Sequence, residues 1–255
     1  MSRPHRPVLS VEEAQEHILS TVPVLAPETV PLLEAAGRVL REAVAADRDI
    51  PPLTNAAMDG FAVRGQDLGK GIRLLIIGEV AAGHEAAVPV GKGEAMRIMT
   101  GAPLPEGADT VVRFEDTRVE DTSVHILDPP ATGKNVRPAG EDVRAGEIVL
   151  RPGKVLRPQE VGMLASLGRL QVAVTRRPKV AILGTGDEVV PPNVAPGPSQ
   201  IRDANSYTVA AQVQRYGGIP LLLGLAQDEE ELVRSGIREA VERGADFIIT
   251  SGGVS

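Results

Sequence analysis

The stretch Lys179-Val180-Ala181-Ile182-Leu183-Gly184-Thr185-Gly186-Asp187-Glu188 decides the fold class of this chain. Its first five residues predict a short buried strand, and the glycine-rich turn that follows ends in two adjacent carboxylates. The alternation continues downstream, with a helix predicted over 204–216, a strand over 220–225, a helix over 229–243 and a strand over 247–250. Strands that alternate with helices of this length predict an α/β domain with a parallel sheet and right-handed crossovers.

Upstream, the region from about 52 to 140 predicts a small all-β domain. Short apolar runs at Leu74–Ile77, Val111–Phe114 and Val124–Leu127 are separated by glycine and proline. This is the pattern of short strands joined by turns.

The remaining segments predict helices and one further strand. Ser10 and Glu13 have the spacing of a capping box at the start of a helix that runs to about residue 22. A second helical segment is predicted at 32–36. A short helix over 159–167 should end at Gly168, and an alternating strand over 170–174 follows it.

The composition of the 255 residues is that of a globular protein without cysteine chemistry. Hydrophobic residues make up 42% and charged residues 24%, and the net charge of -7 argues against a general nucleic-acid binder. The absence of cysteine excludes disulfides, thiolate zinc sites and cysteine nucleophiles. No apolar run approaches the ~18 residues of a membrane helix, and no signal peptide is read, so we expect a cytoplasmic protein with no membrane partner.

The last five residues, Ser251-Gly252-Gly253-Val254-Ser255, form a glycine-rich loop directly after a predicted buried strand. Such a loop should open into a helix that covers the strand. We therefore expect the chain to be a fragment of a longer protein, with an incomplete α/β domain.

The two glycine-rich loops at strand ends, Gly184–Gly186 and Ser251–Gly253, are the first candidate ligand site. In open α/β sheets ligands bind outside the carboxyl ends of the strands, and backbone N–H groups of glycine turns can line a phosphate. Ordinary βα turns also contain glycine, so the glycines alone leave both interpretations open.

Asp187 and Glu188 favour a functional loop, because two carboxylates beside an anion site require a cation such as Mg²⁺. A solvated acidic turn is the alternative. Asp228 follows the next strand, where it can cap the helix that begins there or join a metal site.

Three loops of the β region hold further candidates. Asp59 and Gly60 would suit a hairpin turn, and Thr100 offers a hydroxyl to its own backbone or to a ligand. Arg137 lies close to two carboxylates, among them Asp142, which suggests either an ion pair at a domain boundary or a clamp for an oxyanion.

Six segments in order resemble the molybdopterin molybdenumtransferase family, which includes MoeA and the gephyrin E domain. They are Asn55–Ala62, Met99–Val112 (MTGAPLPEGADTVV), Asn135–Val143 (NVRPAGEDV), Leu183–Val189 (LGTGDEV), Ile201–Asn205 (IRDAN) and Thr250–Ser255 (TSGGVS). The resemblance covers almost the whole chain.

The resemblance implies a multidomain fold of α/β and β parts. Residues 1–45 and 141–176 would form an elongated N-terminal domain, residues 46–140 an inserted β domain, and residues 177–255 a truncated molybdopterin-binding α/β domain. It also implies a homodimer, with a molybdopterin adenylyltransferase as upstream partner and molybdoenzymes downstream.

The implied reaction is molybdenum insertion into adenylylated molybdopterin, with molybdate as substrate, Mg²⁺ as cofactor and AMP as product. Carried over by motif, the catalytic residues are Asp187, Glu188, Asp59 and Thr100. Ligand contacts would come from Gly184, Thr185, Gly186, Arg137, Asp203, Asn205, Ser251, Gly252 and Gly253, and metal ligands from Asp187, Glu188, Asp142 and Asp228.

Two other functions stay open. A family member could hold the pterin or a partner protein as a scaffold without catalysing insertion. The second is the related adenylyltransferase activity. The predicted β domain argues against it, because that activity requires the α/β module alone. The carboxylates at 59, 187 and 188 together with Thr100 favour the insertase, because a scaffold has no need of them.

Overall fold

The computed structural model describes residues 9–251, and these group into two compact units. Unit 1 contains residues up to Glu42 and those from Pro152 onward, and unit 2 contains Ala43–Arg151. The chain therefore leaves unit 1, builds unit 2 and returns. The finer division into three domains stays a prediction. No helix within residues 9–251 is long and apolar enough to cross a membrane.

The first part of unit 1 consists of short helices around a two-stranded ribbon. Helix α1 (Val11–Thr21) begins with the predicted capping box: Ser10 Oγ accepts from the Glu13 backbone N–H, and the Glu13 carboxylate accepts from the Ser10 N–H. Strand β1 (Pro27–Pro31) pairs antiparallel with β12 (Gln171–Thr175), and helix α2 (Pro158–Ser166) precedes β12.

One predicted helix in this part has a different form. The segment expected to be helical at 32–36 is a single 3₁₀ turn, η1 (Leu32–Ala35). Pro31 precedes it and Gly37 follows with a φ of 75°, so the chain has room for one turn only. The α2 prediction is confirmed, including its end at Gly168, which has a φ of 68°.

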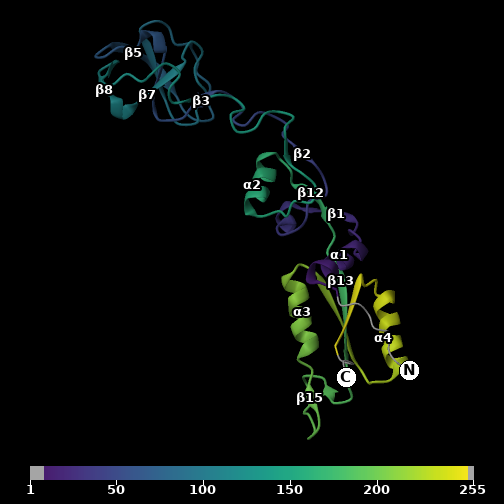
Figure 1. Cartoon of the computed structure of the whole chain (residues 1–255). Coiled ribbons are helices and arrows are strands. Elements are labelled where there is room, and N and C mark those ends of the chain that lie inside the picture. Colours follow the sequence, from purple (N-terminus) through teal and green to yellow (C-terminus); the bar gives the residue numbers. More distant parts are fainter. Residues whose placement is uncertain (1–8, 252–255) are drawn as a thin grey trace. The chain divides into compact units, whose positions relative to one another are not determined.

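The second part of unit 1 is a three-stranded parallel sheet between two helices, as predicted (Figure 1). The strand order is β16-β13-β17. Helices α3 and α4 cover opposite faces in Figure 1. The elements are β13 (Lys179–Thr185), β14 (Val189–Val190), β15 (Ile201–Arg202), α3 (Asn205–Arg215), β16 (Ile219–Ala226), α4 (Glu230–Glu242) and β17 (Phe247–Ser251).

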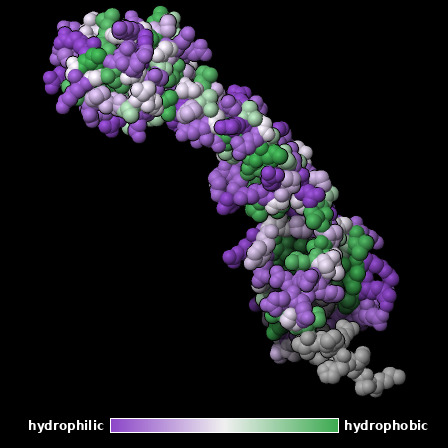
Figure 2. Space-filling view, turned by 45° about the horizontal axis from the view of Figure 1, so that its top comes forward, coloured by the Kyte–Doolittle hydropathy of each residue, from purple (hydrophilic) through white to green (hydrophobic). Residues whose placement is uncertain are grey.

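The central strand β13 is apolar along its length because both of its faces are covered. Residues 180–184 are all buried, whereas Phe247, Ile248 and Ile249 of the edge strand β17 are each more than a third exposed. Hydrophobic side chains are accordingly visible at the surface of this part of unit 1 in Figure 2. The pattern agrees with the rule that central parallel strands read as continuous hydrophobic runs.

Unit 2 is a six-stranded, mostly antiparallel sheet with the strand order β7-β4-β6-β5-β9-β8. Its core lies on both faces of β4, where Phe61 and Val63 pack on one side and Ala62 packs on the other. The strands are β4 (Gly60–Val63), β5 (Arg73–Val80), β6 (Glu94–Ile98), β7 (Thr110–Arg113), β8 (Thr117–Glu120) and β9 (Ser123–Ile126), with the short pairs β2 (Val44–Ala45) with β11 (Ile148–Leu150) and β3 (Asn55–Ala56) with β10 (Val136–Arg137). The predicted β fold of this region is confirmed.

Candidate functional site

The strand order of the parallel sheet places a ligand crevice between β13 and β17. The chain runs from β13 outward to β16 and then crosses back to β17 on the other side of β13. Such a reversal is a topological switch point, and in open α/β sheets ligands bind there, outside the carboxyl ends of the two strands. The strand order by itself thus points to β13 and β17, and these are the two strands that lead into the glycine-rich segments of the sequence.

The carboxyl ends of β13 and β17 are joined by a hydrogen bond. The Thr185 hydroxyl donates to the Ser251 carbonyl oxygen at 2.8 Å, and Gly184 pairs with Ser251 in the register of β13 and β17. Thr185 and Ser251, predicted as ligand contacts from separate motifs, therefore lie side by side. The predicted contacts at Gly252 and Gly253 lie outside the described residues.

Two of the predicted carboxylates also meet at this edge of the sheet. The Asp228 backbone N–H donates to Asp187 Oδ1 at 3.2 Å, which links the loop after β13 to the loop after β16. Both side chains are exposed, as is that of Glu188. The carboxylates of these loops are therefore open to solvent and to a ligand.

Close contacts explain why two positions of the first loop, 184 and 186, are glycine. A Cβ atom on Gly184 would lie 2.5 Å from Leu225 Cδ2 and 3.0 Å from Ser206 Oγ, so the packing of β16 and α3 requires glycine there. Gly186 has a φ of 135°, and a Cβ on it would lie 2.8 Å from Glu188 Oε2. The structure thus gives Gly184 a packing role beside its predicted ligand contact.

Asp203 and Asn205 occupy different environments at the start of α3. The parallel pair β14–β15 holds Asp203 beside the first loop, where its N–H donates to the Val190 carbonyl at 2.9 Å. Its buried carboxylate accepts from the Ser206 N–H at 3.0 Å, in the first turn of α3. Asn205 is exposed on the first turn and available to a ligand.

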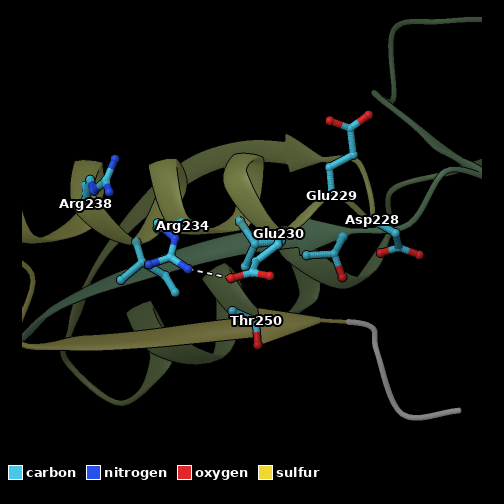
Figure 3. A pocket seen from close by; sticks show the side chains of 9 residues that line it. Asp228, Glu229, Glu230, Arg234, Arg238 and Thr250 are labelled. Carbon is cyan, nitrogen blue, oxygen red and sulfur yellow. Dashed lines mark hydrogen bonds and ion pairs between the residues drawn. The ribbon is translucent and has the colours of Figure 1, made fainter.

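A cavity of about 610 Å³ opens at the same edge, on the side of the sheet covered by α4 (Figure 3). Its volume is within the range of small-molecule sites. In Figure 3 the Glu230 and Arg234 side chains, joined by an ion pair along α4, lie between the helix and the strand that carries Thr250, and Asp228 lies near the start of α4. The lining residues are Thr185, Asp228, Glu229, Glu230, Val233, Arg234, Ile237, Arg238 and Thr250.

Most of this lining was not predicted as site residues. Asp228 was left open between a helix cap and a site residue; the N-cap of α4 is Glu229, without a side-chain cap, so the cap interpretation of Asp228 is wrong. Four of the α4 residues that line the cavity form i, i+4 pairs in the sequence, Val233 with Ile237 and Arg234 with Arg238, so each pair was expected to share one side of the helix. Only the packing of α4 on the sheet shows which stripe faces the cavity.

In unit 2, three of the quoted motifs converge on one side of the small β3–β10 pair. The Ala56 N–H donates to the Ala102 carbonyl at 3.0 Å and the Gly101 N–H to the Ala56 carbonyl at 2.8 Å, while Arg137 pairs with Asn55 across the strands. The segments around 55, 100 and 136 are therefore neighbours, although about 80 positions separate the first from the last.

Asp59 and Thr100 are bound directly to each other. Asp59 Oδ1 accepts from the Thr100 N–H and from its hydroxyl, both at 2.7 Å. The backbone bond, followed by the hydroxyl bond, lowers the pKa of Asp59 from its ordinary value of 3.8. The low pKa favours the ionised form of Asp59, and the Thr100 oxygen, which donates its proton to Asp59, keeps its lone pairs for a ligand.

Arg137 is held by two carboxylates. Its Nε donates to Glu141 at 3.1 Å and its guanidinium to Asp142 at 2.7 Å, and Asp142 first, then Glu141, raise the pKa of Arg137. The sequence left open whether Arg137 forms an ion pair or a clamp for an oxyanion, and the structure shows the ion pair. Its charge is largely compensated by these partners.

The predicted metal ligands do not form a complete protein site among the described residues. Within 9–251 no group of three or more His, Asp or Glu side chains could hold a metal ion. Asp187 and Asp228 lie on neighbouring loops of unit 1, whereas Asp142 belongs to unit 2. Two carboxylates suit an Mg²⁺ ion whose remaining ligands are phosphate oxygens and water, which is how Mg²⁺ is commonly bound beside nucleotides.

A switch point with glycine-rich strand ends and exposed carboxylates is an arrangement typical of α/β proteins that bind small anionic ligands. Comparison with protein families makes this specific. Residues 9–168 match the MoeA N-terminal region (domain I and II), and residues 181–255 match a probable molybdopterin binding domain. The chain belongs to the MoeA family, and the predicted resemblance is confirmed.

Relatives and solved structures agree with this membership. The chain is 38% identical to a molybdopterin molybdenumtransferase of Nostoc over 99% of its length, and 37% identical to that of Haemophilus influenzae over 97%. It spans 60% and 62% of these two relatives. A crystal structure of the molybdopterin biosynthesis moeA protein of Pyrococcus horikoshii OT3 is 36% identical with a TM-score of 0.86, covering 96% of this chain and 66% of that one.

Proposed function

We propose that this chain carries the pterin-binding part of a molybdopterin molybdenumtransferase. The reaction would insert molybdenum from molybdate into adenylylated molybdopterin and release AMP. One observation carries the proposal: in a chain that matches the MoeA family over residues 9–168 and 181–255, the carboxyl ends of β13 and β17 are joined through Thr185 and Ser251 at the switch point of the sheet. The named activity of the relatives in Nostoc and Haemophilus influenzae supports it.

In this proposal the first step is binding of the phosphate-bearing pterin at the switch point. The N–H groups of the glycine loops line the phosphates, since glycine lets the backbone approach closely. The bond between Thr185 and Ser251 fixes the ends of β13 and β17 before a ligand binds. Binding therefore costs less conformational entropy at these two residues. The apolar wall formed by Val233 and Ile237 suits one face of a flat ring, and Asp228 and Glu229 suit its N–H groups.

Asp187 and Glu188 would act on the phosphoanhydride. Both are exposed beside the phosphate loop, and Asp187 is oriented by the Asp228 N–H. A bound Mg²⁺ ion would supply charge neutralisation for the leaving AMP. Asp187 and Asp228 would hold that ion, and Glu188 would position or deprotonate the attacking water or oxyanion.

Asp59 and Thr100 are proposed as the contribution of the β region to the reaction. The hydroxyl of Thr100 donates to Asp59, so its lone pairs accept hydrogen bonds from a ligand. Arg137 would donate to an oxyanion such as molybdate through the guanidinium N–H groups that Glu141 and Asp142 do not use, with its charge largely compensated by these two carboxylates.

We also propose that the active form is a homodimer. Helix α1 has no buried residue, and its apolar side chains Val11, Ile18 and Leu19 are each at least 60% exposed. An amphipathic helix with an uncovered apolar face indicates an interaction surface. Sedimentation analysis should give a dimer, and the Ile18→Glu/Leu19→Glu variant should shift it to a monomer. A dimer unaffected by these changes would exclude α1 from the interface.

The partners and location follow from the reaction. A molybdopterin adenylyltransferase would supply the substrate, molybdoenzymes would receive the product, and the location would be cytoplasmic. The alternative is pterin binding without turnover, which is favoured by the absence of a complete protein metal site among residues 9–251.

The test is AMP release from adenylylated molybdopterin with Mg²⁺ and molybdate, under single-turnover conditions. Wild-type chain should release AMP, and Glu188→Gln should slow release about 100-fold, the range of a general acid or base. Asp47→Asn, which changes an exposed carboxylate of unit 2, should leave the rate unchanged. Binding without release would establish the alternative, and full activity of Glu188→Gln would contradict the assigned role.

A further inference from the structure

A second cavity, of about 510 Å³, lies in unit 1 at the amino end of the parallel sheet. It is lined by three segments that are far apart in sequence, at 36–39, 175–178 and 214–217. These precede β13 or follow α3, so the cavity lies at the opposite end of the strands from the switch point. Four of its lining residues are arginines: Arg38, Arg176, Arg177 and Arg215.

Two of these arginines are neutralised by acidic neighbours. Arg38 is buried, and it pairs with Glu28 and donates to the Thr175 carbonyl at 2.8 Å. Arg176 forms a two-pronged pair with Asp246, at 2.7 and 2.5 Å. Both guanidiniums are thus held in place.

The other two arginines keep their charges uncompensated. Among the described residues, neither the Arg177 nor the Arg215 side chain forms an ion pair or a hydrogen bond, and both residues are exposed. Two free guanidiniums beside two fixed ones give this cavity a positive field within a chain whose net charge is -7. An anion in the cavity would relieve the repulsion among them.

The remaining lining groups also suit an anion rather than a cation. Among the described residues that line the cavity there is no Asp or Glu, so it offers no carboxylate ligand to a metal cation. A guanidinium fork binds phosphate through two parallel N–H···O bonds, which a carboxylate-lined or neutral pocket cannot do. The volume is within the range of small-molecule sites.

We propose that this cavity is an anion site that binds a small phosphorylated compound through Arg177 and Arg215. Arg38 and Arg176, held by Glu28 and Asp246, form part of the cavity wall, and the exposed ring of Tyr216 borders the site. The site is separate from the pterin crevice and does not depend on the proposed reaction.

Calorimetric titration of the chain with inorganic pyrophosphate tests this site directly. The variant Arg177→Gln/Arg215→Gln removes both free guanidiniums. The matched control is Arg41→Gln/Arg169→Gln, which removes the same charge from two exposed arginines of unit 1 that line no part of the cavity. Circular dichroism of both variants checks that the fold is kept.

We expect one pyrophosphate per chain at this site, an affinity loss of at least tenfold in the Arg177/Arg215 variant, and less than a twofold change in the control. Citrate at equal concentration should bind at least tenfold more weakly than pyrophosphate. Equal losses in the two variants would reduce the effect to overall charge and overturn the proposal. Unchanged binding in the Arg177/Arg215 variant would place the pyrophosphate elsewhere, for example at the switch point, and would also overturn it.

Discussion

Replacing Asp246 with Asn should destabilise unit 1 by disconnecting β17 from the segment that leads into β13. The Asp246 carboxylate accepts two hydrogen bonds from the Arg176 guanidinium, at 2.7 and 2.5 Å, and one from the Lys179 N–H at 2.9 Å. The side chain is only 14% exposed, so solvent screens these bonds weakly. Asn keeps one acceptor oxygen but turns an N–H group toward a guanidinium.

The magnitude follows from the titration of this carboxyl group. The Arg176 guanidinium, with the Lys179 N–H as a smaller cause, lowers the pKa of Asp246 from 3.8 to about 2. Because each tenfold change in acidity corresponds to about 1.4 kcal/mol, this lowering of the pKa corresponds to roughly 2 kcal/mol once the partial exposure of Arg176 is taken into account. Hydrogen bonds to charged groups, at about 1.5–3 kcal/mol, give the same range.

The assay uses tyrosine fluorescence during urea unfolding. The chain has two tyrosines and no tryptophan. Both tyrosines, Tyr207 and Tyr216, belong to α3 or its C-cap, so the signal reports unit 1. Asp246→Asn should lower the free energy of unfolding by about 2 kcal/mol. Glu239→Gln, which breaks the exposed pair with Arg243, should lower it by less than about 0.5 kcal/mol.

The same variant has a pH signature. Because the pKa of Asp246 is lower in the folded than in the unfolded state, its contribution is complete above about pH 4 and is lost as the pH falls toward 2. Asp246→Asn should therefore flatten the pH dependence of stability in that window. A loss no larger than that of Glu239→Gln, or an unchanged pH dependence, would refute the reasoning.

Two further predictions concern unit 2. Gly60→Ala would place a Cβ atom 1.9 Å from the Val112 carbonyl oxygen and should lower the free energy of unfolding of unit 2 by about 3 kcal/mol. Gly78→Ala is the control, because its Cβ would have its nearest contact 3.9 Å away and should cost under about 1 kcal/mol. Proteolysis of unit 2 under native conditions measures both costs, and similar costs would show that the close approach at Gly60 is not rigid. Thr100→Val removes the hydroxyl bond but not the backbone bond to Asp59, so the pKa of Asp59 should rise yet stay below 3.8 when followed by carboxyl carbon NMR; an unchanged pKa would contradict the hydroxyl contribution.

Local patterns in the sequence predicted the elements whose formation depends on nearby residues. The capping box of Ser10 and Glu13, the stop at Gly168 and the strand–helix alternation after residue 178 all appear in the structure. Each is governed by contacts within a few positions along the chain. The parallel sheet then followed from the general rule for alternating strands and helices.

Features that depend on packing between distant segments were not predictable in this way. The parallel pairing of β5 with β6 inside a mostly antiparallel sheet has no local signature. Asp203 was expected as a ligand contact, and its burial, to 9% exposure, depends on the pairing of β14 with β15 rather than on its neighbours in the sequence. The wall of the α4 cavity likewise depends on which helical stripe faces the sheet.

The sequence predicted the strand-end loops of the candidate site but not the α4 residues that line its cavity. Glycines and carboxylates at strand ends can be read from sequence because strand ends can be located, and the order β16-β13-β17 then brings two of those ends together. The order itself is a tertiary property. The bond between Thr185 and Ser251 is its direct consequence, and it is the contact on which the account of ligand binding depends.

Calorimetric titration of adenylylated molybdopterin into wild-type chain and the Thr185→Val variant tests that account most directly. Thr208→Val is the matched control, because it removes an exposed hydroxyl of α3 that bonds only to the Ala204 carbonyl. Wild type and control should bind one ligand per chain with equal affinity, and Thr185→Val should bind at least tenfold more weakly, about 1.4 kcal/mol. Equal binding by all three proteins, or no binding by wild type, would contradict a pterin site at the switch point.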